Sequence, residues 1–112
     1  MTLRRFHIAL AVSELDASIR EYSSRLGVGP CCVVDGTYAL FRTDQVNLSI
    51  SVRPEAPGTL RHLGFEDPAA PALSMERDPN GFDWERFTEE QQREEIRRLW
   101  PHARFVETEA SR

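Results

Sequence analysis

The stretch from Arg5 to Val12 constrains the fold more than any other part of the chain. Large apolar residues alternate there with His7 and two alanines. This period of two residues predicts a half-buried strand with one large apolar face. The opposite face carries only small side chains and a single histidine, so His7 is the first candidate for a group that faces a ligand.

A helix is expected directly after this strand. Ser13-x-x-Asp16 is a variant of the capping box, in which the serine oxygen accepts an early helix N–H. Apolar residues then recur at helical spacing, at Leu15, Ile19, Tyr22 and Leu26. Gly27 stands where a left-handed C-terminal cap is favoured, and Pro30 prevents the helix from resuming.

Three further strands are expected before residue 53, which gives the order βαβββ. The runs 31–34 and 37–41 favour strand, and Asp35-Gly36 between them is typical of a two-residue type I′ hairpin. That loop would place Val34 opposite Thr37. The run 46–52 alternates large apolar residues with Asn47 and two serines. We expect the helix on the large apolar side of the sheet and a shallow, polar cup for a small ligand on the other side.

The second part of the chain is shorter. Residues 53–59 form a linker, and Leu60–Glu66 follows as a strand with His62 on one face and Arg61 on the other. Shorter strands are expected at 72–76 and 82–87. Thr88-x-x-Gln91 is a capping box that opens a helix ending near Trp100, and residues 88–92 are too polar for the core. Residues 106–112 are expected to form a flexible tail.

Composition narrows the class of protein. A chain of 112 residues with 40% hydrophobic residues predicts one domain, here residues 1–105. It has no apolar run near the roughly 20 residues that span a bilayer, and with a net charge of −4 and no basic patch, neither a membrane nor nucleic acid is an expected partner. The start of the chain carries no secretory signal pattern, and the only cysteines, Cys31 and Cys32, are adjacent and cannot link distant elements, so a cytoplasmic location is expected.

Three residues form the candidate site: His7, His62 and Glu85. Each lies in the middle of an expected strand, on a face that alternates with bulky apolar residues. If the three strands share one curved sheet, the side chains converge on its concave side. Two imidazoles and one carboxylate bind a divalent metal and leave positions for water or substrate. The alternative is two histidines bonded to backbone carbonyls and a solvated glutamate.

Two stretches resemble a known family. HIALAV at 7–12, LDASI at 15–19 and Leu26-Gly27 are similar to the opening of the vicinal oxygen chelate superfamily, which includes glyoxalase I, bleomycin-resistance proteins and extradiol dioxygenases. DPNGFDWE at 78–85 is similar to the closing turn and strand of that family, which ends in a metal-binding glutamate. Residues 58–65, with His62, match the start of its second module. RFH at 5–7, VNLSIS at 46–51 and WERF at 84–87 most resemble the cadmium-induced and arsenic-lyase-like branch.

The resemblance implies an α+β fold in which paired βαβββ modules form a curved mixed sheet. Module one covers about 3–52, a shortened module two covers about 60–87, and a C-terminal helix covers about 88–100. It also implies a divalent metal, Fe(II), Mn or Zn, held by His7, His62 and Glu85. The second module has no room for its helix and one strand. That segment carries the arsenical-binding cysteine pair in the arsenic-lyase-like proteins, so arsenic chemistry is not inferred.

The implied function is that of a metal-dependent enzyme, of dioxygenase, lyase or isomerase type, that acts on a small molecule. Asn47, Ser49 and Tyr38 are the weaker candidates for binding the substrate. The alternatives are a metal-free protein of the same fold that binds a small molecule or confers resistance to one, and a degenerate domain used for dimerisation or regulation.

The shortened module should leave Leu63, Phe65 and Trp84 without a covering helix. We expect the C-terminal helix to cover them through Ile96, Leu99 and Trp100, from the same chain or from a partner subunit. The open sheet edge is a second reason to expect a homodimer.

Overall fold

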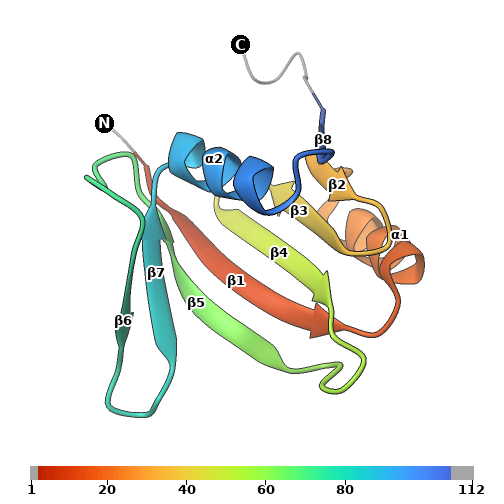
Figure 1. Ribbon diagram of the computed structural model, residues 1–112, viewed down its shortest axis with the longest axis horizontal. Helices are drawn as coiled ribbons and strands as arrows, with labels where there is room; N and C mark the ends of the chain where they lie inside the picture. Colours follow the sequence, from red (N-terminus) through yellow and green to blue (C-terminus); the bar gives the residue numbers. More distant parts are fainter. Residues whose placement is uncertain (1–2, 107–112) are drawn as a thin grey trace.

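The chain folds as α+β, with one mixed sheet and two helices among the described residues (Figure 1). The computed structural model describes residues 3–106, so the tail expected at 106–112 lies almost wholly outside the described residues. The elements are β1 (Arg5–Val12), α1 (Leu15–Leu26), β2 (Cys32–Val34), β3 (Tyr38–Arg42), β4 (Val46–Val52), β5 (Leu60–Glu66), β6 (Ser74–Arg77), β7 (Asp83–Phe87), α2 (Glu89–Leu99) and β8 (Arg104–Phe105). The short strand β8 was not expected, and β6 begins two residues later than expected.

The eight strands are ordered β6-β7-β5-β1-β4-β3-β2-β8. β1 pairs with β4 in parallel, and β3 lies antiparallel beside β4. The other half repeats this arrangement, because β5 pairs with β7 in parallel and β6 lies antiparallel beside β7. The two halves meet where β1 and β5 pair antiparallel. Residues 67–73 connect β5 to β6 directly, where the first half has α1 and β2.

Helix α1 packs on the large apolar face of the first half, as expected. Leu15 is buried there, and the helix contacts a core that includes Phe41 and Ile50. Gly27 caps the helix with a φ of 77°. The expected N-cap at Ser13 is wrong: Glu14 is the N-cap, and its carboxylate accepts the N–H groups of residues 16 and 17 at 3.2 and 2.9 Å. A negative charge at this end is also stabilised by the helix dipole.

The hairpin between β2 and β3 has a longer loop than expected. Val34 pairs with Tyr38 rather than Thr37, so the loop has three residues instead of two. Thr37 N–H donates to the Val34 carbonyl at 2.9 Å. A type I′ turn needs positive φ at both central positions, and among residues 3–106 only glycines, including Gly36, have a positive φ. Asp35 does not adopt that conformation, so the register moves by one residue.

Helix α2 lies on the face opposite α1. The capping box at its start is present, with Thr88 Oγ1 accepting from Gln91 N–H and the Gln91 side chain accepting from Thr88 N–H. Ile96 packs in a buried cluster with residues of β2 and β3, namely Cys32, Val34, Tyr38 and Leu40. The ring of Trp100 lies 4.9 Å from that of Tyr38. These contacts place α2 over the polar side of the sheet.

Within this chain α2 therefore does not cover Leu63, Phe65 and Trp84, and the same-chain form of that expectation is wrong. Those side chains lie on the α1 face of the sheet and are only half-buried. The physical reason is that β2 and β3 present an apolar patch on the otherwise polar face, which gives Ile96 a place to be buried. Neither helix in the described part of the chain has the length and apolar character needed to cross a membrane.

Candidate metal centre

The sheet brings together the three residues singled out from the sequence. His7 on β1 pairs with Gly64 on β5, and Gly64 pairs in turn with Glu85 on β7. His62 lies two residues before Gly64 on the same face. The Nε2 atoms of His7 and His62 are 3.1 Å apart, and Glu85 Oε1 lies 3.0 Å from His62 Nε2 and 3.5 Å from His7 Nε2. Within residues 3–106 this is the group of histidine, cysteine and carboxylate side chains whose donor atoms converge.

Gly64 allows the neighbouring strands β5 and β7 to approach each other closely. A Cβ atom built on Gly64 would lie 2.1 Å from the Glu85 carbonyl oxygen and 2.7 Å from the Glu85 nitrogen. These are backbone atoms, so no side-chain rotation relieves the clash. A glycine at this position is therefore needed for β5 and β7 to pair and for His7 and Glu85 to face each other across β5.

The donor separations fit a single metal ion. A metal about 2.1 Å from its nitrogen and oxygen ligands holds neighbouring ligands roughly 3.0 Å apart in octahedral geometry and roughly 3.4 Å apart in tetrahedral geometry. The three separations in the structure, 3.0, 3.1 and 3.5 Å, lie close to these values. Two histidines and one carboxylate on one side of an ion suit Fe(II), Mn or Zn and leave positions open. The residues present fit a divalent metal.

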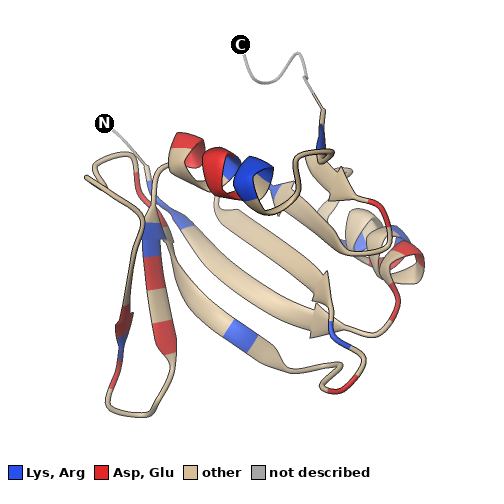
Figure 2. Cartoon of the chain, in the orientation of Figure 1, with Lys and Arg blue, Asp and Glu red and all other residues tan. Residues whose placement is uncertain are grey.

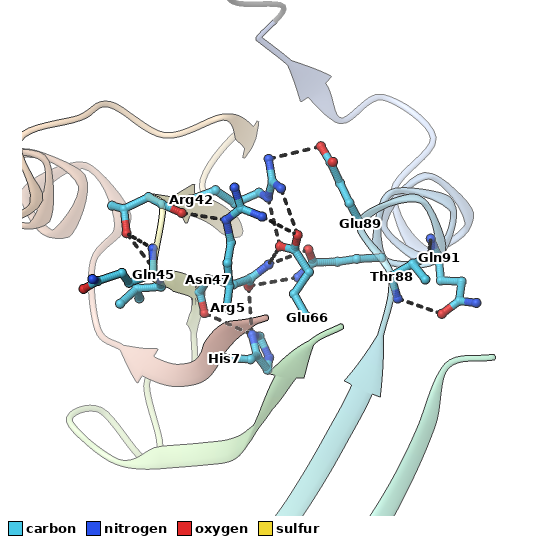
Figure 3. Close-up of polar contacts among 12 residues, drawn as sticks. Arg5, His7, Arg42, Gln45, Asn47, Glu66, Thr88, Glu89 and Gln91 are labelled. Carbon is cyan, nitrogen blue, oxygen red and sulfur yellow. Dashed lines mark hydrogen bonds and ion pairs between the residues drawn. The ribbon is translucent and has the colours of Figure 1, made fainter. Parts of the chain in front are cut away.

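The hydrogen bonds of Asn47 decide which nitrogen of His7 carries the proton (Figure 3). The Asn47 Nδ2 group lies 2.9 Å from a carboxylate oxygen of Glu66, which can only accept, so the amide orientation is determined. Asn47 Oδ1 is then an acceptor, and it lies 2.8 Å from His7 Nδ1. His7 Nδ1–H therefore donates, and the unprotonated Nε2 faces the other two candidate ligand atoms, His62 Nε2 and Glu85 Oε1. Histidines that bind metals are commonly oriented by such a partner.

A charged network surrounds Asn47. Glu66 is buried and accepts from both Arg5 and Arg42, each at 2.9 Å, and Arg42 also pairs with Glu89 of α2 at 3.1 Å (Figure 3). Gln92 of α2 exchanges two hydrogen bonds with the Asn47 amide. Gln92 was expected to lie outside the core and is buried. Among the described residues no buried side-chain nitrogen or oxygen lacks a partner.

Glu85 is ionised at neutral pH. Burial raises the pKa of this carboxyl group, but its interactions with the side chains of His62 and His7 outweigh the burial and bring the pKa to about 2. A deprotonated carboxylate is the form that binds a metal. In contrast to the Glu85 carboxyl group, the thiols of Cys31 and Cys32 are protonated at neutral pH, because burial raises the pKa of both.

The triad forms part of the wall of a cavity of about 280 Å³. Tyr38 and Ser49 line this cavity as expected, but Asn47 does not, because it lies fully buried behind His7. The roof is formed by α2, and the remaining wall includes two arginines that sequence reasoning did not select. The lining residues are His7, Tyr38, Ser49, Ser51, Arg53, Arg61, His62, Leu73, Glu85, Phe87, Gln92, Glu95, Ile96, Leu99 and Trp100.

Comparison with known proteins adds no identity. No protein-family model and no curated protein matches this chain. The site itself presents two imidazoles and one ionised carboxylate to a cavity with polar and apolar walls.

Proposed function

We propose that the protein is a divalent-metal-dependent enzyme of the vicinal oxygen chelate type that acts on a small molecule. The convergence of His7, His62 and Glu85, with donor separations of 3.0–3.5 Å, carries this proposal. The repeated strand pairing supports the family assignment. In each half a parallel pair, β1·β4 or β5·β7, is followed by an antiparallel neighbour, as paired modules require.

Each residue of the site has a role in this proposal. His62 and Glu85 supply two ligand atoms, and His7 supplies the third in the tautomer that Asn47 selects. A bound divalent cation would act as a Lewis acid that polarises substrate oxygens. The cavity gives a small substrate a place beside the triad, and the apolar walls formed by Phe87, Ile96 and Trp100 exclude water from part of it.

Metal analysis tests the proposal. The purified protein is reconstituted anaerobically with Fe(II), Mn or Zn, and bound metal is measured after removal of the excess. We expect about one equivalent per chain in the wild type and a loss of at least tenfold in affinity for His7→Ala. His102→Ala is the matched control, because His102 is exposed and does not line the cavity. Its metal content should equal that of the wild type.

One observation favours a second candidate, a metal-free protein that binds a small molecule. His62 Nε2 lies 3.0 Å from Glu85 Oε1, so the triad also satisfies its own hydrogen bonds without an ion. Absence of stoichiometric metal with all three ions would contradict the enzyme proposal and favour this second candidate. A homodimer is proposed for either function and is considered below.

A further inference from the structure

Two arginines, Arg53 and Arg61, line the same cavity as the triad. Strict alternation along β5 would place Arg61 and His62 on opposite faces. The pairing of β5 with β1 shifts, however: Ala9 pairs with His62, whereas Leu10 pairs with Leu60. Arg61 is thus the extra residue of a bulge, and bulges commonly redirect a side chain beside a site. Arg61 Nη1 donates to Ser51 Oγ at 3.2 Å, which holds the guanidinium on the cavity side.

These two guanidinium groups have no acidic partner in residues 3–106. Most other arginines of the described chain pair with a carboxylate, as Arg5 and Arg42 do with Glu66. Both arginines line the cavity, so two like charges face the same volume. Two like charges that face one cavity repel each other, and a bound anion relieves that repulsion.

The charges of the cavity wall depend on the metal. Arg53 and Arg61 are positive, and Glu85 and Glu95 are negative. Glu95 also pairs with Arg98 at 3.3 Å, outside the set of lining residues. The wall is thus neutral without a metal and carries two positive charges with a divalent ion.

Figure 2 shows how few charged residues the central strands β1 and β4 carry, whereas α2 carries both signs.

We infer that the ligand of this cavity is a small organic carboxylate whose carboxylate group binds Arg61 and Arg53 while its other oxygens face the triad. The planar guanidinium matches a carboxylate with two parallel hydrogen bonds. A volume of about 280 Å³ equals roughly nine water molecules and limits the ligand to a small molecule. The part of this inference that concerns the triad rests on the proposed metal; the part that concerns the arginines does not.

A matched pair of probes tests the inference. Zinc-loaded protein is titrated calorimetrically, without oxygen, with 3,4-dihydroxybenzoate and with its neutral analogue 3,4-dihydroxybenzamide. Both offer the same two adjacent oxygens to a metal, and only the first carries a remote carboxylate. We expect the wild type to bind the benzoate about tenfold more tightly, the preference that one charge-assisted contact provides.

The arginine variants identify the source of that preference. Arg61→Gln should bring the two dissociation constants to within about twofold of each other, and Arg53→Gln should reduce the ratio less. Arg20→Gln is the matched control, because Arg20 is exposed on α1, has no carboxylate partner among the described residues and does not line the cavity. This control should keep the full preference. Thermal unfolding of each variant checks that it is folded.

The outcomes separate this inference from the proposed function. Normal zinc content with equal binding of the two probes overturns the inference and leaves the metal proposal standing. Absence of bound zinc, with Fe(II) and Mn also failing to bind, overturns the metal proposal, and the titrations are then made on the metal-free protein. There, a preference for the benzoate that Arg61→Gln removes supports the arginine site, whereas equal or undetectable binding of both probes overturns it.

Discussion

A single buried amide controls the candidate metal ligand on β1. Asn47 donates to Glu66 and to the Gln92 side-chain oxygen, and accepts from His7 Nδ1 and from Gln92 Nε2. Every hydrogen-bonding group of the amide is used, so its orientation has no alternative. Asn47, which does not line the cavity, thus determines which ring nitrogen of His7 is unprotonated.

Replacing Asn47 should weaken metal binding without removing a ligand. We expect Asn47→Ala to lower zinc affinity by about 10- to 100-fold, because His7 loses the partner that orients its ring. Zinc competition measures the affinity, and nitrogen NMR of the imidazoles reports the tautomer, which should be Nδ1–H for His7 in the wild type. Ser49→Ala, on the same face of the same strand, is the control and should bind zinc normally. A wild-type His7 protonated on Nε2 would contradict the role given to Asn47.

Gly64 is the residue whose size matters most for the pairing of β5 and β7. We expect Gly64→Ala to lower the free energy of unfolding by about 3 kcal/mol or more, because its Cβ would meet the Glu85 backbone at 2.1 Å. Urea unfolding measures the change. Gly29→Ala is the matched control, since nothing lies within 4 Å of its Cβ, and it should change stability by less than about 0.5 kcal/mol. Equal effects of the two substitutions would refute the steric argument.

At the scale of elements, α2 is both a roof for the cavity and a structural support. Its apolar anchor is Ile96, which is 3% exposed, whereas Leu99 is 51% exposed although it also lines the cavity. On the same helix, Gln92 and Glu89 connect to the network behind His7. The position of the helix therefore affects both the cavity and the ligand shell.

Truncating the aliphatic side chains of Ile96 and Leu99 should distinguish the residue that anchors α2 from one that only lines the cavity. We expect Ile96→Ala to cost about 2–5 kcal/mol in the free energy of unfolding, because it leaves a cavity between α2 and the strands β2 and β3. Leu99→Ala should cost less than about 1 kcal/mol, since half of its side chain is already in solvent. Denaturant unfolding of both variants measures this difference. A smaller cost for Ile96→Ala than for Leu99→Ala would mean that α2 is not anchored as described.

At the scale of the whole molecule, Glu66 connects elements that are distant in sequence. Its carboxylate contacts Arg5 of β1, Arg42 of β3 and Asn47 of β4. Burial raises the pKa of this group, but hydrogen bonds from Arg42 and Asn47 and the nearby arginine charges outweigh it, so the pKa is lowered from 4.5. The folded state therefore favours the ionised form more than the unfolded state does.

This shift predicts a specific dependence of stability on pH. A lowered pKa in the folded state adds stability above the unfolded value of 4.5, and that stability is lost as the pH falls through the folded value. We expect Glu66→Gln to be less stable than the wild type at pH 7, with the difference narrowing below about pH 4.5. Urea unfolding from pH 7 to pH 3 measures it. A constant or widening difference would exclude this role for Glu66.

The apolar face beside α1 predicts self-association. Phe6, Phe65 and Trp84 form a half-buried aromatic cluster there, with ring centroids 5.7–6.4 Å apart, and the outer strand β6 is exposed. We expect a homodimer that buries this face, because contiguous apolar surface is uncommon on monomers. Sedimentation equilibrium measures the mass. Leu63→Lys on the same face should give the monomer, whereas the control Leu99→Lys should not. A monomeric wild type at all concentrations would disprove the prediction.

Local patterns carried much of the fold. The alternation in β1, β4, β5 and β7, the stripe of α1 and the capping box at Thr88 all depend on neighbours within a few residues, and each appears in the structure. The choice of His7, His62 and Glu85 as a converging set also followed from which strand face each occupies. What these features share is that a period of 2 or 3.6 residues determines the direction of a side chain before any long-range contact forms.

Tertiary structure decided the remaining features, because each depends on contacts between distant segments. Helix α2 packs on the face where β2 and β3 form an apolar patch. The three-residue loop at 35–37 sets the register in which these two strands pair. The bulge that turns Arg61 into the cavity came from the pairing of β5 with β1. The burial of Asn47 behind His7, and not on the cavity wall, came from Glu66 and Gln92, which lie 19 and 45 residues away. A sequence pattern gives the direction of a side chain, but only packing between elements determines what that side chain meets.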